Sequence, residues 1–189
     1  MNTSQREYIE RLCFLDEDRH NSRHVLASEF LLELSHTLMT KEAIEEAPSQ
    51  LRDCSEEELK QRIAEFKPAG CIGVPVVNDG CVVGFADVLC PRRYEWRRLS
   101  DGWHALPAGL VLGEVKIKPQ PAELVLQQIA FYKRFTRPSK VVIVVDYEAP
   151  ALKRLSAGSN IQVFSLGDVF EEWVKARPRP VAKELVALK

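Results

Sequence analysis

Residues 140–146, KVVIVVD, limit the fold of this chain more than any other stretch. An unbroken run of β-branched residues is typical of a strand that is covered on both faces. Before it, residues 121–136 predict a helix opened by Pro119 and Pro121, and residues 110–117 predict another strand. A strand, a helix and a strand of this length form a right-handed parallel crossover. We therefore expect a sheet with at least two parallel strands.

An antiparallel hairpin is expected before this crossover. Residues 70–90 contain two apolar runs, CIGVPVV and CVVGFADVL, on either side of Asn78-Asp79-Gly80. The pair Asp-Gly is a strong signal for a tight hairpin turn. Pro75 cannot donate a ladder hydrogen bond, so the first strand should lie at an edge of the sheet. Hairpin and crossover together predict a mixed α/β fold, with a central sheet flanked by helices.

Helices precede and follow these strands. Residues 24–39 repeat apolar side chains at helical spacing, and residues 55–66 open with a capping box made by Ser55 and Glu58. The remaining expected elements are a short helix at 4–14, an extended hairpin loop at 91–109, a short helix near 149–155, a strand at 161–166 and a helix at 168–176. No linker is long enough to separate two domains, so we expect a single domain over residues 1–189.

Composition favours an ordinary globular protein. The 189 residues are 46% hydrophobic and 28% charged, and no apolar run approaches the ~20 residues of a membrane helix. The N-terminal residues lack the apolar core of a signal peptide. The five cysteines include no CxxC pair, and an odd number cannot all be bridged. We expect reduced thiols in a cytoplasmic protein, with Cys71, Cys81 and Cys90 packed within strands, and neither a zinc nor an iron–sulfur site.

The first strand of the crossover carries charge that a buried strand would not need. Because successive side chains point to opposite faces, Glu114, Lys116 and Lys118 share one face, and Val115 and Ile117 share the other. Burying such charges without partners costs several kcal/mol or more. Either this face is open to water, as in an unrelated α/β protein with a solvated strand, or something there requires charge.

Asp87 supplies a second carboxylate from the neighbouring strand. One interpretation is a strand-end aspartate that accepts hydrogen bonds from backbone amides. In the other, Asp87 and Glu114 converge into an oxygen-rich site of the kind that suits Mg²⁺ or Mn²⁺. An ammonium group beside them, Lys116, could orient or deprotonate a water or neutralise charge on a phosphate. A cation, an activated water and a positive group are the requirements of phosphodiester hydrolysis.

These residues resemble the signature of a known superfamily. Asp87 followed by Glu114-Val115-Lys116 resembles the D…(D/E)-x-K pattern of the PD-(D/E)XK nucleases, although Phe85-Ala86 precedes Asp87 where the superfamily name has proline. The resemblance implies a restriction-endonuclease-like αβββαβ core. In this chain that core would cover about residues 24–146, followed by a C-terminal β-α extension at 147–176 and a basic tail at 177–189.

A second motif lies on the crossover helix. Gln128 and Tyr132, in QQIAFY, are similar to the Q-x-x-x-Y motif of the RecB-like and lambda-exonuclease-like branch. Residues four apart share one face of a helix, so both side chains can reach towards the strand that carries Glu114. The alternative is an ordinary helix face with one buried tyrosine. By resemblance, Gln128 and Tyr132 would belong to the catalytic site.

The resemblance also implies roles for the strand residues. Asp87 and Glu114 would ligate Mg²⁺ or Mn²⁺ with help from the main-chain carbonyl of Val115, and Lys116 would position or activate the attacking water. The superfamily often adds an acidic residue from the first helix, where both Glu29 and Glu33 qualify by position.

We favour Glu33 because it lies nearer the border of the apolar stripe, while a solvated glutamate is the alternative for either residue. RecB-like enzymes often place a histidine in this helix. His24 and His36 are available, and each fits a surface or capping histidine better than a metal ligand.

Candidate nucleic-acid contacts come from the hairpin loop. RRYEWRR supplies Arg92, Arg93, Arg97 and Arg98 beside stackable rings, a combination that suits a nucleic-acid backbone. The alternative is an exposed hairpin whose arginines cover aromatic side chains. Lys118 could contact a phosphate or reach solvent. Lysines and arginines outnumber acidic residues from residue 67 onwards, which supports an anionic partner only weakly because solvated charges give the same balance.

The sequence therefore predicts a Mg²⁺- or Mn²⁺-dependent nuclease that hydrolyses DNA. The alternative function is a nucleic-acid-binding or assembly module on the same fold that does not cleave. DNA is the expected partner. No appended helicase or specificity domain fits within 189 residues, so a helicase or another protein partner could supply targeting. A homo-oligomer is compatible with the sequence. No membrane association is expected.

Overall fold

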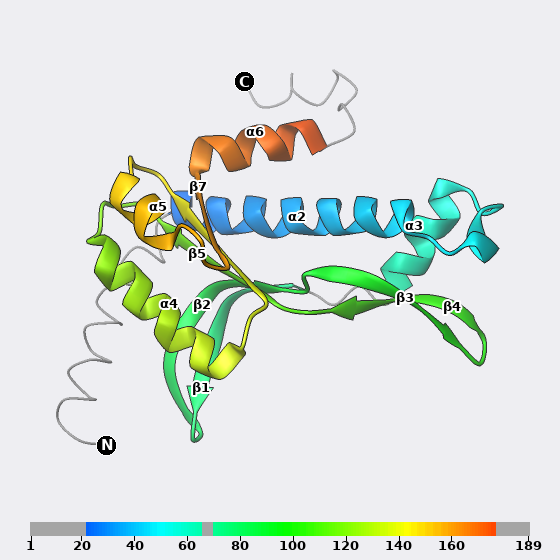
Figure 1. Cartoon of the computed structure of the whole chain (residues 1–189), viewed down its shortest axis with the longest axis horizontal. Helices are drawn as coiled ribbons and strands as arrows, with labels where there is room; N and C mark the ends of the chain where they lie inside the picture. Colours follow the sequence, from blue (N-terminus) through cyan, green and yellow to red (C-terminus); the bar gives the residue numbers. More distant parts are fainter. Residues whose placement is uncertain (1–21, 66–69, 177–189) are drawn as a thin grey trace.

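The computed structural model of the chain describes residues 22–65 and 70–176 (Figure 1). Its centre is a five-stranded sheet with strands in the order β1-β2-β5-β6-β7. Antiparallel pairing joins β1 to β2 and β2 to β5, whereas β5, β6 and β7 are parallel, so the sheet is mixed as predicted. These strands are Cys71–Asn78, Cys81–Cys90, Val111–Lys116, Lys140–Val145 and Ile161–Ser165. The expected helix at 4–14 and the tail at 177–189 lie outside the described residues.

The parallel crossover is confirmed. Helix α4, Ala122–Thr136, connects β5 to β6, and the two strands pair in parallel with Val111 beside Lys140 and Lys116 beside Val145. Every residue of β5 is buried, and so are the last five residues of β6. Two covered faces explain why both strands are rich in branched apolar residues.

The hairpin β1–β2 also follows the prediction. Asp79 and Gly80 form its turn with φ angles of 48° and 78°, a conformation that Asp-Gly adopts at low cost. β1 is an edge strand, as Pro75 requires. Cysteine placement differs from the expectation, because the thiols of Cys71 and Cys81 lie at the exposed ends of this hairpin and only Cys90 is buried within its strand.

Helices cover both faces of the sheet (Figure 1). On one face, α2 (Ser22–Glu45) and α6 (Leu166–Ala176) pack against Val88, Val115 and Val144. On the other, α4 and α5 (Pro150–Ser156) pack against Leu112 and Ile143. The molecule is thus a three-layer α/β structure, and no helix in the described part of the chain is long and apolar enough to cross a membrane.

A second, smaller unit lies at the far end of α2 from the site described below (Figure 1). The two-stranded hairpin β3–β4 (Arg93–Leu99 and Gly102–Ala108) packs with α3 (Glu56–Glu65) on the last turns of α2, where Trp96 Nε1 donates to the carbonyl of Ala43 at 2.7 Å. A single-turn 3₁₀ helix at Ser49–Leu51 precedes α3.

The start of α3 matches its sequence signal. The backbone amide of Glu58 donates to Ser55 Oγ at 3.3 Å, and the backbone amide of Ser55 donates to Glu58 Oε2 at 2.7 Å. Two amides that would otherwise lack partners at the helix start are thereby satisfied, so the predicted capping box is confirmed.

Candidate active site

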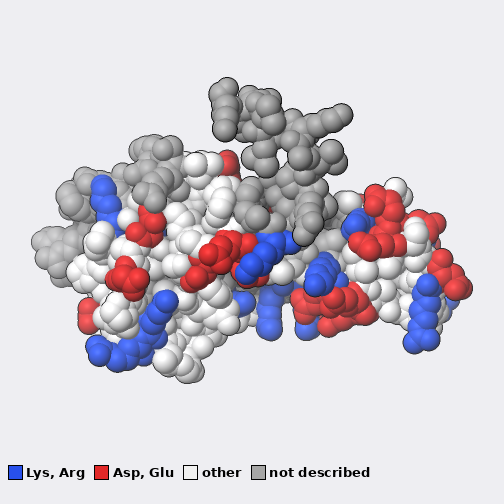
Figure 2. Space-filling view, turned by 90° about the horizontal axis from the view of Figure 1, so that it is seen from above, with Lys and Arg blue, Asp and Glu red and all other residues white. Residues whose placement is uncertain are grey.

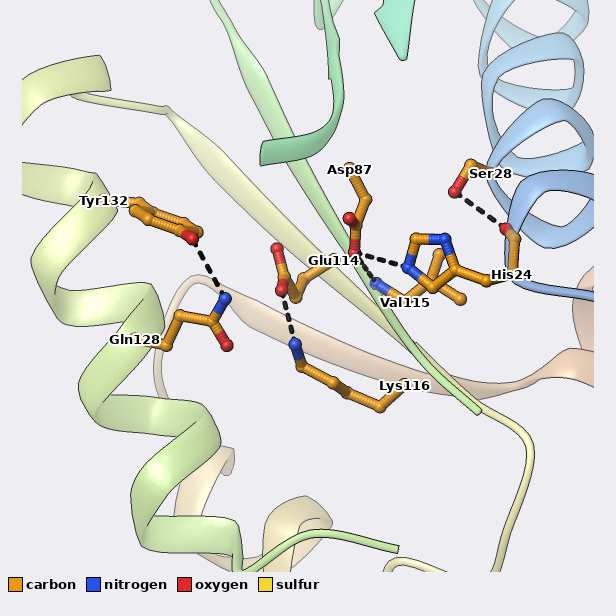
Figure 3. A network of polar contacts seen from close by, with 8 residues as sticks. All are labelled: His24, Ser28, Asp87, Glu114, Val115, Lys116, Gln128 and Tyr132. Carbon is orange, nitrogen blue, oxygen red and sulfur yellow. Dashed lines mark hydrogen bonds and ion pairs between the residues drawn. The ribbon is translucent and has the colours of Figure 1, made fainter. Parts of the chain in front are cut away.

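The candidate site forms where the ladder between β2 and β5 stops. The last pair of that ladder is Val88 with Gly113, and the next would be Asp87 with Glu114. Instead, Asp87 Oδ2 accepts a hydrogen bond from the backbone amide of Val115 at 2.7 Å. The carboxylate takes the place of a backbone acceptor, so it satisfies an amide and is held at the point of divergence (Figure 3).

Glu114 and Lys116 lie on the face of β5 that α4 covers, as strand alternation predicted. Lys116 Nζ donates to Glu114 Oε1 at 2.6 Å, and the two residues are 3% and 0% exposed. The side chain of Val115 points to the opposite face, into the core beneath α2. A fully buried carboxylate and ammonium carry a large desolvation penalty, which their mutual contact only partly offsets. The charged face is therefore not a solvated one.

His24 joins the site from the first turn of α2. It is 6% exposed, and its Nε2 lies 3.3 Å from Asp87 Oδ2. Burial lowers the pKa of His24, but the hydrogen bond to Asp87 and the negative charges of Asp87 and Glu114 raise it more, so that the pKa lies above its ordinary value. The expectation of a surface or capping histidine is wrong. The sequence contained a signal for this position: His24 lies three and seven residues before Ala27 and Leu31, so it shares the face of the helix that these buried residues occupy.

Glu33, favoured from the sequence as the acidic contribution of this helix, lies elsewhere. It is exposed and follows His24 by nine residues, which places it about 180° around the helix from the buried face. Glu29 is also exposed. The error has a physical cause: Leu26 belongs to the apolar stripe of the sequence but is 48% exposed, whereas the face that is buried in this half of the helix contains His24, Ala27 and Leu31 and is rotated away from both glutamates.

The crossover helix completes the site. Gln128 Nε2 donates to Tyr132 Oη at 3.0 Å, and both residues are fully buried. Tyr132 packs so closely on β2 that a Cβ added to Gly84 would lie 2.7 Å from its hydroxyl oxygen. Gln128 Oε1 is buried without a hydrogen-bond partner among the described residues, and Figure 3 shows this side chain facing Glu114 and Lys116. The structure thus brings both motifs of the sequence together.

The four arginines predicted to bind nucleic acid do not form one surface. Arg93 and Arg97 both pair with Glu95, at 2.6 and 3.1 Å, and Arg98 is exposed towards the tip of the β3–β4 hairpin. Arg92 precedes β3 and lies beside the start of β5. Figure 2 shows acidic and basic residues interspersed at the end of the molecule that holds this hairpin and α3.

Lys118 and a neighbouring hollow lie just outside the site. Lys118 follows β5 and is exposed. A hollow of about 350 Å³ lies between α2, α6 and the end of β6. Among the described residues that line it, Asp146 carries a charge and the others are Leu26, Ala27, Phe30, Leu166, Gly167 and Phe170. The backbone amide of Asp146 donates to the carbonyl of Lys116 at 3.0 Å, so this hollow adjoins the site without containing it.

The donor set suits a hard divalent cation, although the geometry is not preformed. Asp87 and Glu114 offer carboxylate oxygens and His24 offers an imidazole nitrogen, a combination that Mg²⁺ and Mn²⁺ accept. Each carboxylate lies beside one basic group, Asp87 beside His24 and Glu114 beside Lys116, so a cation would have to displace these contacts. No three His, Cys, Asp or Glu side chains in residues 22–65 and 70–176 are arranged as a ready cation site. Here the ligand candidates contact one another and Lys116 instead.

Comparison with known proteins gives no relative for this chain. No protein-family model matches it, no curated protein matches its sequence, and no solved structure matches its fold. Membership of the PD-(D/E)XK superfamily, implied by the motifs, therefore receives no support from these comparisons. Any assignment of function depends on the geometry of the site.

Proposed function

We propose that this protein is a Mg²⁺- or Mn²⁺-dependent nuclease that hydrolyses phosphodiester bonds of DNA. One observation carries the proposal: Asp87, Glu114 and Lys116 are buried together at the end of a strand ladder, with Gln128 of α4 facing them. Hydrophobic residues of similar volume would stabilise such a position at least as well. Buried charge that packing does not require is typical of a catalytic site.

Asp87, Glu114 and His24 would hold the cation. Asp87 is fixed in position by the amide of Val115, so one carboxylate is already oriented before a ligand arrives. The main-chain carbonyl of Val115 is the further ligand that the motif suggests. When bound, the cation supplies Lewis acidity that polarises a phosphoryl oxygen and positive charge that stabilises the transition state.

Lys116 would act on the water and the phosphate. Its ammonium group is within hydrogen-bond distance of Glu114, so it is adjacent to any phosphate that approaches this carboxylate. From there it can orient the attacking water and balance negative charge as the new P–O bond forms. Gln128 and Tyr132 would be positioning residues, because their mutual hydrogen bond fixes the amide that faces Glu114 and Lys116.

The second candidate is a nucleic-acid-binding or assembly module on the same fold. A specific observation favours it: Lys116 and His24 already pair with the two carboxylates, and the described residues contain no ready cation site. In such a module these pairs would be structural. Nucleic acid would remain the ligand, and a helicase or another protein partner would supply targeting.

Cleavage assays separate the two candidates. The full chain is incubated with linear and circular, single- and double-stranded DNA in Mg²⁺, Mn²⁺ or EDTA. We expect cation-dependent cleavage that falls about 10²–10⁴-fold in Asp87→Asn and Glu114→Gln. Glu123→Gln is the matched control, because Glu123 is exposed at the start of α4 and should cut at the wild-type rate. A wild type that binds DNA but cuts none under either cation would establish the module.

A further inference from the structure

Five cations from three separate segments gather at one corner of the sheet. Lys133, Arg134 and Arg137 lie at the C-terminal end of α4, Lys140 opens β6, and Arg92 precedes β3; we call this set the basic corner.

Close contacts and hydrogen bonds join these segments. A Cβ added to Gly109 would lie 3.1 Å from both Arg92 Cβ and Ser139 Oγ, which places Arg92 beside the residue that precedes Lys140. Lys133 Nζ donates to Asn160 Oδ1 at 2.9 Å, and Asn160 Nδ2 donates to the carbonyl of Ser139 at 3.4 Å. The basic corner is therefore a single surface.

The basic corner is not neutralised by its surroundings. No Asp or Glu occurs in residues 102–113, 124–145 or 149–167, which are the stretches that meet there. None of its five cations forms an ion pair among the described residues. On the β3–β4 hairpin, by contrast, Arg93 and Arg97 are already held by Glu95. Unpaired cations are available to an anion at the corner and much less so on the hairpin.

The distance from this surface to the candidate site follows from the strand register. Lys140 lies beside Val111, and Glu114 is three residues further along β5, a separation of about 10 Å along the strand. Phosphates of one strand lie farther apart than their rise of about 3.4 Å along the helix axis, because the strand winds around that axis, so 10 Å corresponds to about one to two nucleotides. A backbone that enters the site at Glu114 can thus reach the basic corner without leaving the protein.

We infer that the basic corner binds the phosphate backbone of the DNA substrate about one to two nucleotides from the phosphate held at Glu114. This inference rests on the proposed function for its choice of substrate. It moves the principal backbone contact from the β3–β4 hairpin to α4 and the start of β6. Of the four arginines in RRYEWRR, only Arg92 belongs to that contact.

The test measures DNA binding in EDTA, so that it does not depend on cleavage. The corner variant carries Arg92→Gln, Arg137→Gln and Lys140→Gln. Glutamine keeps the side-chain stem and leaves the left-handed backbone of Arg137, with φ of 46°, no more strained than in the wild type. Affinity for a labelled 20-base-pair duplex is measured by fluorescence anisotropy between 50 and 200 mM salt.

The charge-matched control carries Lys41→Gln, Arg52→Gln and Arg62→Gln on α2, the following loop and α3, away from the basic corner. Loss of three phosphate contacts should lower the log–log salt slope by about 2.7 in the corner variant, whereas the control should keep the wild-type slope. If the corner variant is not folded by circular dichroism, the single Lys140→Gln variant should lower the slope by about 0.9.

Equal slopes for the corner and control variants would overturn the inference even if the protein cuts DNA. Displacement of the duplex by poly-glutamate at equal charge concentration would overturn it too, since the surface would then be a general anion site. Reduced binding by the corner variant alone, in a protein that cuts no DNA, would uphold the inference and overturn the nuclease.

Discussion

Removing the ammonium group of Lys116 tests whether Glu114 is a charged carboxylate that can bind a divalent cation. In Lys116→Met, a side chain of similar length leaves the Glu114 carboxylate buried, at 0% exposure, without its 2.6 Å contact. Breaking a buried ion pair from one side typically costs about 3–5 kcal/mol. In a chain of this size 1 kcal/mol shifts Tm by about 2–4 °C, so Tm should fall by roughly 6–20 °C in EDTA.

A divalent cation should then restore much of the loss. A cation at 100 times its Kd adds about 2.7 kcal/mol to the stability of a folded protein that binds it. Because Lys116→Met removes the competing ammonium group, Mg²⁺ or Mn²⁺ should raise Tm more in the variant than in the wild type. Differential scanning fluorimetry with and without each cation provides the measurement.

The double variant Glu114→Gln/Lys116→Met is the control. It removes both charges, so its Tm should lie well above that of Lys116→Met and should not respond to either cation. The reasoning would be refuted by a Lys116→Met protein that melts with the wild type in EDTA and is unaffected by cations. In that case Glu114 would carry no buried charge that needs a counter-ion.

Two further predictions follow from close packing and burial. Gly84→Ala should lower the free energy of unfolding by about 1–3 kcal/mol and slow cleavage, because the new methyl group would displace Tyr132. In the control Gly167→Ala, the methyl group meets only an ordinary contact at 3.7 Å, so stability and cleavage should not change. Urea unfolding measures the first effect and the cleavage assay the second. Burial raises the pKa of Cys90 to about 11, so only about one Cys90 thiol in a thousand is ionised at pH 8. Labelling with DTNB, followed by mass mapping, should find exposed Cys81 modified within minutes and Cys90 modified only after unfolding. Rapid labelling of Cys90 in the native protein would contradict this.

Local sequence signals predicted the elements of this fold because each is determined by its own residues. The turn at Asp79-Gly80, the Ser55–Glu58 capping box and the crossover are all confirmed. Alternation along β5 also predicted that Glu114 and Lys116 share one face, where they form a buried pair, and the neighbouring position of β2 brings Asp87 to the backbone amide of Val115.

The features that the sequence did not predict, the position of His24 and the exposure of Glu33, depend on how α2 packs against the rest of the fold. Its 24 residues, about 36 Å in length, extend beyond the five-stranded sheet, so its two halves face different partners. The first half brings His24 to the end of the ladder, and the second supports the β3–β4 hairpin through Trp96 and Ala43. No single apolar stripe describes such a helix. An average over both halves wrongly favoured Glu33.

The two interpretations of Asp87 that the sequence left open are not exclusive. The hydrogen bond from Val115 shows that Asp87 accepts from a backbone amide, although Asp87 lies within β2, where its ladder with β5 ends, and not at the end of the strand. The same contact fixes the carboxylate beside His24 and next to the Glu114–Lys116 pair, where a catalytic ligand would have to be. A carboxylate has two oxygens and about four lone-pair directions, so accepting one amide does not prevent it from binding a cation. The end of the ladder is where a strand can present a carboxylate to a ligand without leaving its own backbone unsatisfied.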